Sequence, residues 1–131
     1  MSQENVEIVR RHIEAFNRRD LSTWVALFSS DAEIDWSRAR GPFKGFYRGR
    51  RGQEAFWEVW LTFDYGKVEA HDFREAGSEV VVPNTAIFRG RQGIEVTARS
   101  AFVFTVESEQ IVRYRIFQEQ AEALEAAGLR E

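Results

Sequence analysis

His12 is the first residue of the sequence whose type and position suggest chemistry. An imidazole exchanges a proton near neutral pH. The segment around it repeats apolar residues every three or four positions, and winding it at ~100° per residue places His12 on the apolar side. His12 is therefore a candidate acid, base or hydrogen-bond donor. The alternative is a packed histidine bonded to a backbone carbonyl, to Tyr114 or to Asn84.

Asp35 is a second candidate, because it directly precedes Trp36 in an expected strand. A carboxyl group held against tryptophan rings would have a raised pKa and could act as an auxiliary base. That orientation requires a one-residue shift or a bulge in the strand. Regular alternation instead points Asp35 to solvent, beside Arg38 or Arg40.

The neighbours His71 and Asp72 raise the question of a metal site, but adjacent residues on a strand point to opposite faces and cannot hold one ion together. The sequence has two histidines, no cysteine and no clustered carboxylates. Its glycines fit neither a phosphate loop nor a dinucleotide fingerprint. We therefore expect no metal and no cofactor.

A basic, glycine-rich segment runs from Asp35 to Gln53 without a single acidic residue in between. Its cations are Arg38, Arg40, Lys44, Arg48, Arg50 and Arg51. The whole chain carries a net charge of −3, so the rest of it is strongly acidic. Binding of nucleic-acid phosphates needs a continuous basic surface without acidic neighbours, and we expect no nucleic-acid partner.

The elements that position these residues can be inferred from hydrophobic periodicity. Helical periods predict an amphipathic helix over 4–18, a short helix carrying Trp24, Leu27 and Phe28, and a third helix over 52–63, with a strand near 32–36 after the second helix. From Gly66 onward the period is two. It predicts strands over 67–77, 78–90, 93–108 and 110–118, with a turn at Gly90–Gly93, before a short helix over 119–128.

Helices followed by an antiparallel meander predict an α+β fold, with the helices on one face of a curved sheet. A length of 131 residues suits one domain over 1–131. The charged, amphipathic start is unlike a signal peptide, and no apolar run approaches the ~20 residues of a membrane span. We expect a cytoplasmic protein without a membrane partner.

Three stretches of the sequence carry a resemblance to a known family: "AFNRRDLSTWVALFSSDAEI", "FYRGRRGQEAFW" and "FVFTVESEQIVRYRIFQ". Together they resemble the SnoaL-like branch of the nuclear transport factor 2-like superfamily. The resemblance implies a cone, in which a strongly bent antiparallel sheet wraps the first helix and leaves a pocket open at one end. It also implies a homodimer formed through the outer face of the sheet.

The superfamily includes isomerases, cyclases, dehydratases, epoxide hydrolases and proteins without known activity, so function has to be argued from the pocket. Matching this sequence to the ketosteroid isomerases of the superfamily puts His12 at their hydroxyl donor, Trp36 at their base and Ser100 at their second carboxyl. Only His12 is ionisable. The resemblance therefore does not imply isomerisation by that mechanism.

Strand alternation within the cone selects a set of inward residues in which rings bind a ligand and polar groups orient it. The expected pocket residues are Phe16, Trp24, Phe28, Trp36, Tyr47, Phe56, Trp60, Asn84, Phe88, Ser100, Phe102 and Tyr114. In the same cone the basic segment passes the open end. We expect it to form a pocket rim or lid that attracts an anionic ligand.

The leading hypothesis is a protein that binds a small, largely apolar organic molecule, and the basic rim fits an anionic ligand somewhat better than a neutral one. As an enzyme it would be a cofactor-independent isomerase, lyase or hydrolase, with His12 and Asp35 moving protons and Tyr114 and Asn84 orienting the substrate. The competing hypothesis is a non-catalytic binding or dimerisation module whose pocket is filled by its own aromatic side chains. A third is a nucleic-acid binder.

Overall fold

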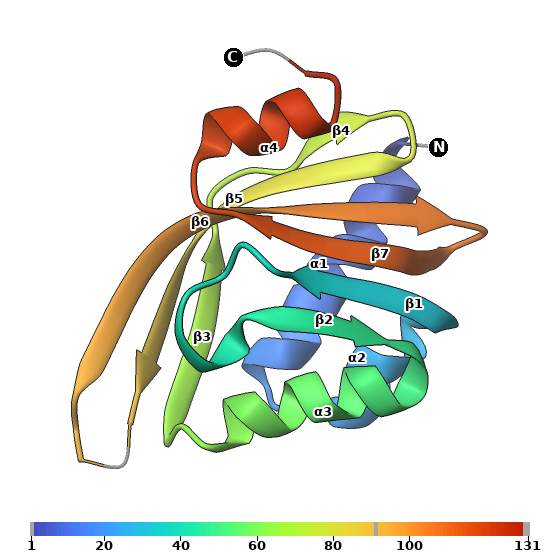
Figure 1. Cartoon of the computed structure of the whole chain (residues 1–131). Helices are drawn as coiled ribbons and strands as arrows, with labels where there is room; N and C mark the ends of the chain where they lie inside the picture. The colour runs from blue at the N-terminus through green and yellow to red at the C-terminus, as the bar shows by residue number, and fades with distance from the viewer. Residues whose placement is uncertain (1, 91, 130–131) are drawn as a thin grey trace.

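The computed structural model describes residues 2–90 and 92–129, which form four α helices, one short 3₁₀ helix and a seven-stranded sheet (Figure 1). In chain order the elements are α1 (Ser2–Asn17), α2 (Leu21–Ala26), β1 (Phe28–Trp36), η1 (Gly41–Phe43), β2 (Gly45–Arg48), α3 (Gly49–Leu61), β3 (Tyr65–Ala70), β4 (Arg74–Ala76), β5 (Glu79–Arg89), β6 (Glu95–Glu107), β7 (Gln110–Phe117) and α4 (Gln120–Ala126). The expected α+β fold is confirmed.

The strands follow the order β2-β1-β7-β6-β5-β3, and β4 pairs with the far end of β5. Figure 1 shows the long strands β5 and β6 bending as they run toward the tip of their hairpin, so that the sheet curls around α1. One pairing differs from the expected antiparallel meander. Strand β1 lies parallel to β7, because the chain crosses over through α3 and the whole β3–β6 region before β7 returns to pair beside β1.

The concave face of the sheet carries the main core, which α1, α2 and α3 cover. The expectation that all helices share this face is wrong for α4. Outward residues of β5, β6 and β7 pack against α4 in a second apolar cluster. The strands contribute Val81, Ala101, Val103 and Phe117, and α4 contributes Ala123 and Leu124. At this end the sheet therefore has helices on both faces, whereas the other described helices cover its concave face alone.

The expected strand over 67–77 is interrupted, and Pro83 supplies the reason. Strand β3 pairs with β5 only as far as Ala70 opposite Asn84, and β4 resumes at Arg74 opposite Val81. Pro83 lies in the gap: the His71 amide donates to Pro83 O (2.8 Å), but Pro83 has no amide N–H to return the bond, so the ladder stops there. In the turn expected at Gly90–Gly93, the Gly93 amide donates to Gly90 O (3.0 Å), while Arg91 lies outside the described residues.

A second local departure is a bulge between β6 and β7, at Thr105 and Val106. Ile111 pairs with Val106, and the register shift turns Ile111 into the core in place of Val112. Beyond the bulge Tyr114 and Ile116 face inward, as simple alternation predicts.

The basic segment is ordered, and not the long loop that its composition suggests. Its middle forms β2, which pairs with β1, and its end forms the first turn of α3. Gly52 permits this join, because a Cβ there would lie 2.8 Å from the Tyr47 carbonyl carbon. Arg50 donates to Val25 O (2.7 Å), and the buried Gln53 donates to Ser29 O (3.1 Å).

Candidate ligand cavity

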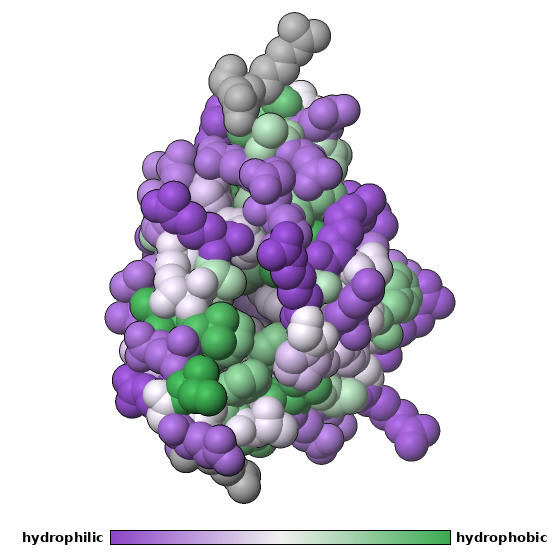
Figure 2. Space-filling model, turned by 60° about the vertical axis from the view of Figure 1, so that its left-hand side comes forward, coloured by the Kyte–Doolittle hydropathy of each residue, from purple (hydrophilic) through white to green (hydrophobic). Residues whose placement is uncertain are grey.

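A cavity of about 620 Å³ opens between β6 and the segment that links β1 to η1. Figure 2 shows a hollow on this side of the molecule with hydrophobic residues along its border. Its aromatic walls are Trp36, Phe43, Trp60, Phe63, Phe88 and Phe102. Smaller residues leave the space between these rings, namely Ala39, Ala86, Ala98, Val96 and Ile116.

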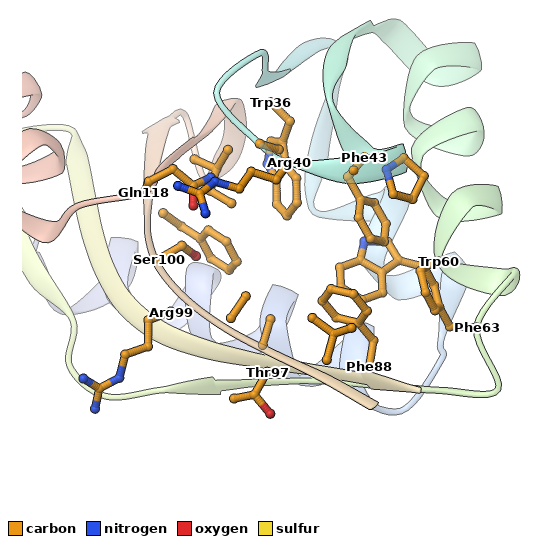
Figure 3. A pocket seen from close by; sticks show the side chains of 18 residues that line it. Trp36, Arg40, Phe43, Trp60, Phe63, Phe88, Thr97, Arg99, Ser100 and Gln118 are labelled. Atoms are coloured by element: carbon orange, nitrogen blue, oxygen red, sulfur yellow. The ribbon is translucent and has the colours of Figure 1, made fainter. Parts of the chain in front are cut away.

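The polar and the aromatic side chains occupy different ends of the cavity. Figure 3 shows Arg40, Gln118 and Ser100 at one end, and Phe43, Trp60, Phe63 and Phe88 at the other. Thr97 and Arg99 border the cavity through β6, but their side chains point away from it in the same view. Arg40 is therefore the cation directed at the cavity among the residues that line it.

Hydrogen bonds within the protein hold the polar end in place. Gln118 Nε2 donates to Arg38 O (2.8 Å), which ties the end of β7 to the segment carrying Arg40. Ser100 Oγ donates to Asn84 Oδ1 (3.2 Å), and Asn84 Nδ2 donates to Val82 O (3.0 Å). Asn84 is thus buried behind Ser100 and does not line the cavity.

Phe43 closes the aromatic end of the cavity. It lies in η1, where Gly41 with a positive φ of 74° and Pro42 turn the chain back toward the sheet. Its ring packs on Trp60 at 4.1 Å between centroids and also contacts Phe63 and Phe88. The same segment therefore supplies a cation to one end of the cavity and a ring to the other.

His12 lies inside the cone, on the apolar side of α1, but it does not reach the cavity. Its ring stacks on Trp24 at 5.1 Å and meets the edges or faces of Phe28, Phe104 and Tyr114. The void beside it measures about 10 Å³, and the rings of Trp60 and Phe102 line both this void and the cavity. Those rings therefore separate His12 from any molecule in the cavity.

Burial decides the protonation state of His12. The side chain is 1% exposed, and desolvation lowers its pKa from 6.5 to about 3. Nε2 has no hydrogen-bond partner among the described residues, so the expected bond from that atom to a carbonyl, Tyr114 or Asn84 does not form. His12 is a neutral, packed ring at physiological pH.

Asp35 points away from the cavity, on the face of β1 opposite Trp36, and the bulge that would turn it inward is absent from β1 at this position. Its carboxylate accepts from the Ser37 amide (3.1 Å) and from Ser37 Oγ (2.7 Å). Desolvation raises its pKa, but the Ser37 bonds together with Arg113 and Arg38 outweigh it, so the pKa lies below its ordinary value. Asp35 therefore has the environment of a surface carboxylate and not of a buried base.

Nine of the other eleven residues expected in the pocket divide into two groups. Trp36, Trp60, Phe88, Ser100 and Phe102 line the cavity, whereas Phe16, Trp24, Phe56 and Tyr114 surround the small void beside His12. Phe28 is core, and Tyr47 instead donates from its hydroxyl to Phe43 O (3.1 Å). Burial also raises the pKa of Tyr114 well above its ordinary value.

Sequence reasoning left several cavity residues out of the expected pocket set: Ala39, Arg40, Pro42, Phe43, Phe63, Ala86, Ala98 and Gln118. The small residues carry no chemical signal of their own. Arg40 and Phe43 belong to the basic segment, whose glycine and proline content indicated a folded-back rim without showing which of its side chains turn inward.

Three of the remaining cations of the basic segment are engaged within the protein. Arg48 pairs with Glu33, Arg50 is held by Val25 and Gln53, and Arg38 stacks on Phe117 at 5.0 Å.

Among the residues outside positions 1, 91 and 130–131, no helix is long and apolar enough to cross a membrane.

Comparisons with known proteins agree on one fold. A family model described as a SnoaL-like domain matches residues 9–114. A protein of unknown function from Burkholderia pseudomallei, called NTF2-like, is similar in structure with a TM-score of 0.79 and 25% identity, over 93% of this chain and 95% of that one. No curated protein sequence matches.

Two further solved structures show the same fold at lower identity. TerC, co-crystallised with polyporic acid, matches with a TM-score of 0.78 and 19% identity, over 95% of this chain and 98% of TerC. SalBIII, an epoxide hydrolase/cyclase-like enzyme of pyran ring formation in salinomycin, matches with a TM-score of 0.78 and 22% identity, over 90% of this chain and 92% of SalBIII.

Proposed function

The chain belongs to the SnoaL-like domain family, and on that premise we propose that it binds a small amphiphilic organic anion, with the apolar body among the aromatic rings and the anionic group at Arg40. The observation that carries this proposal is the division of one cavity into an aromatic end and a cationic end. A ligand that is only apolar would leave Arg40 unused, and a ligand that is only polar would leave the rings without a partner.

The size of the cavity supports a ligand of the scale of a fused-ring acid. Small-molecule sites measure roughly 300–1,000 Å³ and combine apolar walls with a few polar groups. The volume of about 620 Å³ falls within that range. TerC, which shares the fold, was co-crystallised with polyporic acid, and this supports an organic acid as the class of ligand.

The residues lining the cavity favour binding over acid–base catalysis. A general acid or base must come within hydrogen-bond reach of the proton that it moves. The described lining residues include no histidine and no carboxylate, His12 lies behind Trp60 and Phe102, and Asp35 points outward. We therefore place the protein among the binding members of the family and assign no proton-transfer role to His12 or Asp35.

The test compares two compounds of one shape, naphthalene and 2-naphthoate, by calorimetry and thermal stabilisation. We expect both to bind and 2-naphthoate to bind more tightly. Arg40→Gln should weaken 2-naphthoate about fivefold to tenfold and leave naphthalene unchanged, because the charged hydrogen bond is lost. The matched control is Arg11→Gln, on the exposed side of α1.

Two outcomes would contradict the proposal. Equal affinity for both compounds, in the wild type and in Arg40→Gln alike, would show that the cavity does not prefer a ligand with an anionic group. If neither compound binds the wild-type protein, the result would instead support the competing module with a self-filled pocket.

A further inference from the structure

The polar end of the cavity contains two side-chain oxygens that can only accept hydrogen bonds. The first belongs to Ser100, and its neighbour Asn84 decides its role. Asn84 Nδ2 donates to Val82 O (3.0 Å), and a backbone carbonyl can only accept, so the amide of Asn84 has a fixed orientation. Asn84 Oδ1 therefore faces Ser100, which must donate its single hydroxyl hydrogen to it (3.2 Å).

Ser100 Oγ is left as an acceptor at the cavity. A hydroxyl oxygen that has donated its hydrogen still has two lone pairs. Ala98, Ser100 and Phe102 alternate along β6 and all line the cavity, and Figure 3 shows the Ser100 side chain directed toward its interior. No residue of the described chain donates a hydrogen bond to Ser100 Oγ. A ligand in the cavity can therefore supply that donor.

Gln118 provides the second acceptor. Its Nε2 donates to Arg38 O (2.8 Å), which fixes the orientation of this amide in the same way and leaves Oε1 as its other end. Oε1 accepts no bond from the described residues, and it is not among their buried polar atoms that lack a partner, so it is accessible. Figure 3 shows Gln118 at the same end of the cavity as Ser100 and Arg40.

We propose that Ser100 Oγ and Gln118 Oε1 form an acceptor subsite, and that the ligand is a hydroxylated organic acid whose hydroxyl group donates to this subsite while its anionic group binds Arg40. This inference rests on the proposed function, because it describes the polar end of the same ligand. It adds a neutral donor to the anion and the apolar body.

A ligand without a donor would leave both oxygens unsatisfied. When it displaced water from this end, Ser100 Oγ and Gln118 Oε1 would lose the water hydrogens that solvate them and gain nothing in return. An ammonium group would supply hydrogens, but Arg40 at the same end would repel it. A neutral donor avoids both costs.

A hydroxyl group fits this end better than a neutral N–H group. Gln118 Nε2 has a second hydrogen besides the one that it donates to Arg38 O. A hydroxyl oxygen can accept that hydrogen while its own hydrogen is donated to the acceptor subsite. An amide-type N–H has no lone pair to offer in exchange. The pattern of donors and acceptors therefore favours a hydroxyl group.

The test uses 4-hydroxy-2-naphthoate, which adds to 2-naphthoate one hydroxyl group too far from the carboxylate to bond with it. We expect calorimetry to show that this hydroxy acid binds the wild type about twofold to tenfold more tightly than 2-naphthoate, which is the effect of one added hydrogen bond. 4-Methoxy-2-naphthoate keeps the oxygen but lacks the hydrogen. It should bind no more tightly than 2-naphthoate.

Ser100→Ala and Gln118→Met each remove one acceptor. We expect the double variant to bind 4-hydroxy-2-naphthoate and 2-naphthoate with equal affinity. The ratio of the two affinities is the readout, because a displacement of Arg40 caused by the lost bond to Arg38 O would weaken both acids alike. Gln110→Met, at the exposed start of β7, is the matched control and should keep the wild-type ratio.

Two results would overturn this inference alone. One is a hydroxy acid that binds the wild type no more tightly than 2-naphthoate, and the other is a preference for the hydroxy acid that survives in the double variant. If 2-naphthoate itself binds no more tightly than naphthalene, the proposed function fails as well.

Discussion

Burial displaces the pKa of His12 far below its ordinary value, and this makes the stability of the protein depend on pH. The buried imidazole stays neutral in the folded protein down to a pKa of about 3, whereas in the unfolded chain it takes up a proton near 6.5. Below pH 6.5 the unfolded state therefore binds more protons than the folded state. The free energy of unfolding decreases as the pH is lowered from 6.5 to about 3. The histidine opposes folding in acid and has no such effect at neutral pH.

We expect the free energy of unfolding of the wild type to fall by about 2–3 kcal/mol more than that of His12→Leu between pH 7 and pH 4.5. Urea unfolding of both proteins at both pH values measures this difference. Carboxylates that titrate in the same range are common to the two proteins, so their contributions to the pH dependence cancel in the difference. Equal pH dependence in wild type and variant would show that His12 is hydrated in the folded state.

At the residue scale, sequence periodicity predicted which side of its element His12 occupies but not how deep it lies. The 3.6-residue period of α1 correctly placed the ring inside. It could not show that Trp60 and Phe102 stand between that ring and the cavity, because they come from α3 and β6 and their relative placement depends on sheet curvature. The same limit applies to Arg40, whose direction is set by η1.

At the element scale, the join between β2 and α3 is the feature that composition concealed. Four glycines and six cations suggested a loop, yet tight packing of Gly52 on Tyr47 allows a strand and a helix to meet without one. The long strands β5, β6 and β7 were predicted close to their observed bounds, because turn residues delimit their apolar runs. The parallel pairing of β1 with β7 was missed, since alternation describes the faces of a strand and not its neighbours.

Gly52→Ala should destabilise the protein by about 1–2 kcal/mol, although alanine is the better helix former, because the new Cβ would lie 2.8 Å from the Tyr47 carbonyl carbon. Gly90→Ala is the matched control, with its nearest contact at 4.0 Å from Ile94 O, and should change stability by less than about 0.5 kcal/mol. Urea midpoints compare the two. A gain in stability from Gly52→Ala would mean that β2 shifts away from the new Cβ at little cost in free energy.

At the scale of the whole molecule, the outer face of the sheet divides into two parts. The α4 helix covers the part that carries Val81, Val103 and Phe117. The part nearer the β5–β6 hairpin carries the outward side chains of Ile87 and Thr97 and has no helix over it among the described elements. We propose that a homodimer, if it forms through the outer face, uses this second part.

Sedimentation measurements across concentration test the dimer. We expect twice the chain mass for the wild type and a shift to the monomer for Ile87→Asp, because a charge in an apolar interface is costly to bury. Leu61→Asp is the control, since Leu61 is also an apolar surface residue, 49% exposed, but lies at the end of α3, on the opposite side of the sheet. A monomeric wild type, or a dimer that both variants preserve, would contradict this interface.

The parallel pairing of β1 with β7 also has a consequence for how the chain folds. The residues of β1 pair with residues of β7 that lie more than 70 positions later in the sequence, as Ile34 opposite Tyr114 illustrates. Contacts of such sequence separation slow folding, because a large loop must close before they form. During synthesis β1 can pair with β2 as a hairpin, but the other edge of β1 stays open until the final strand, β7, has left the ribosome.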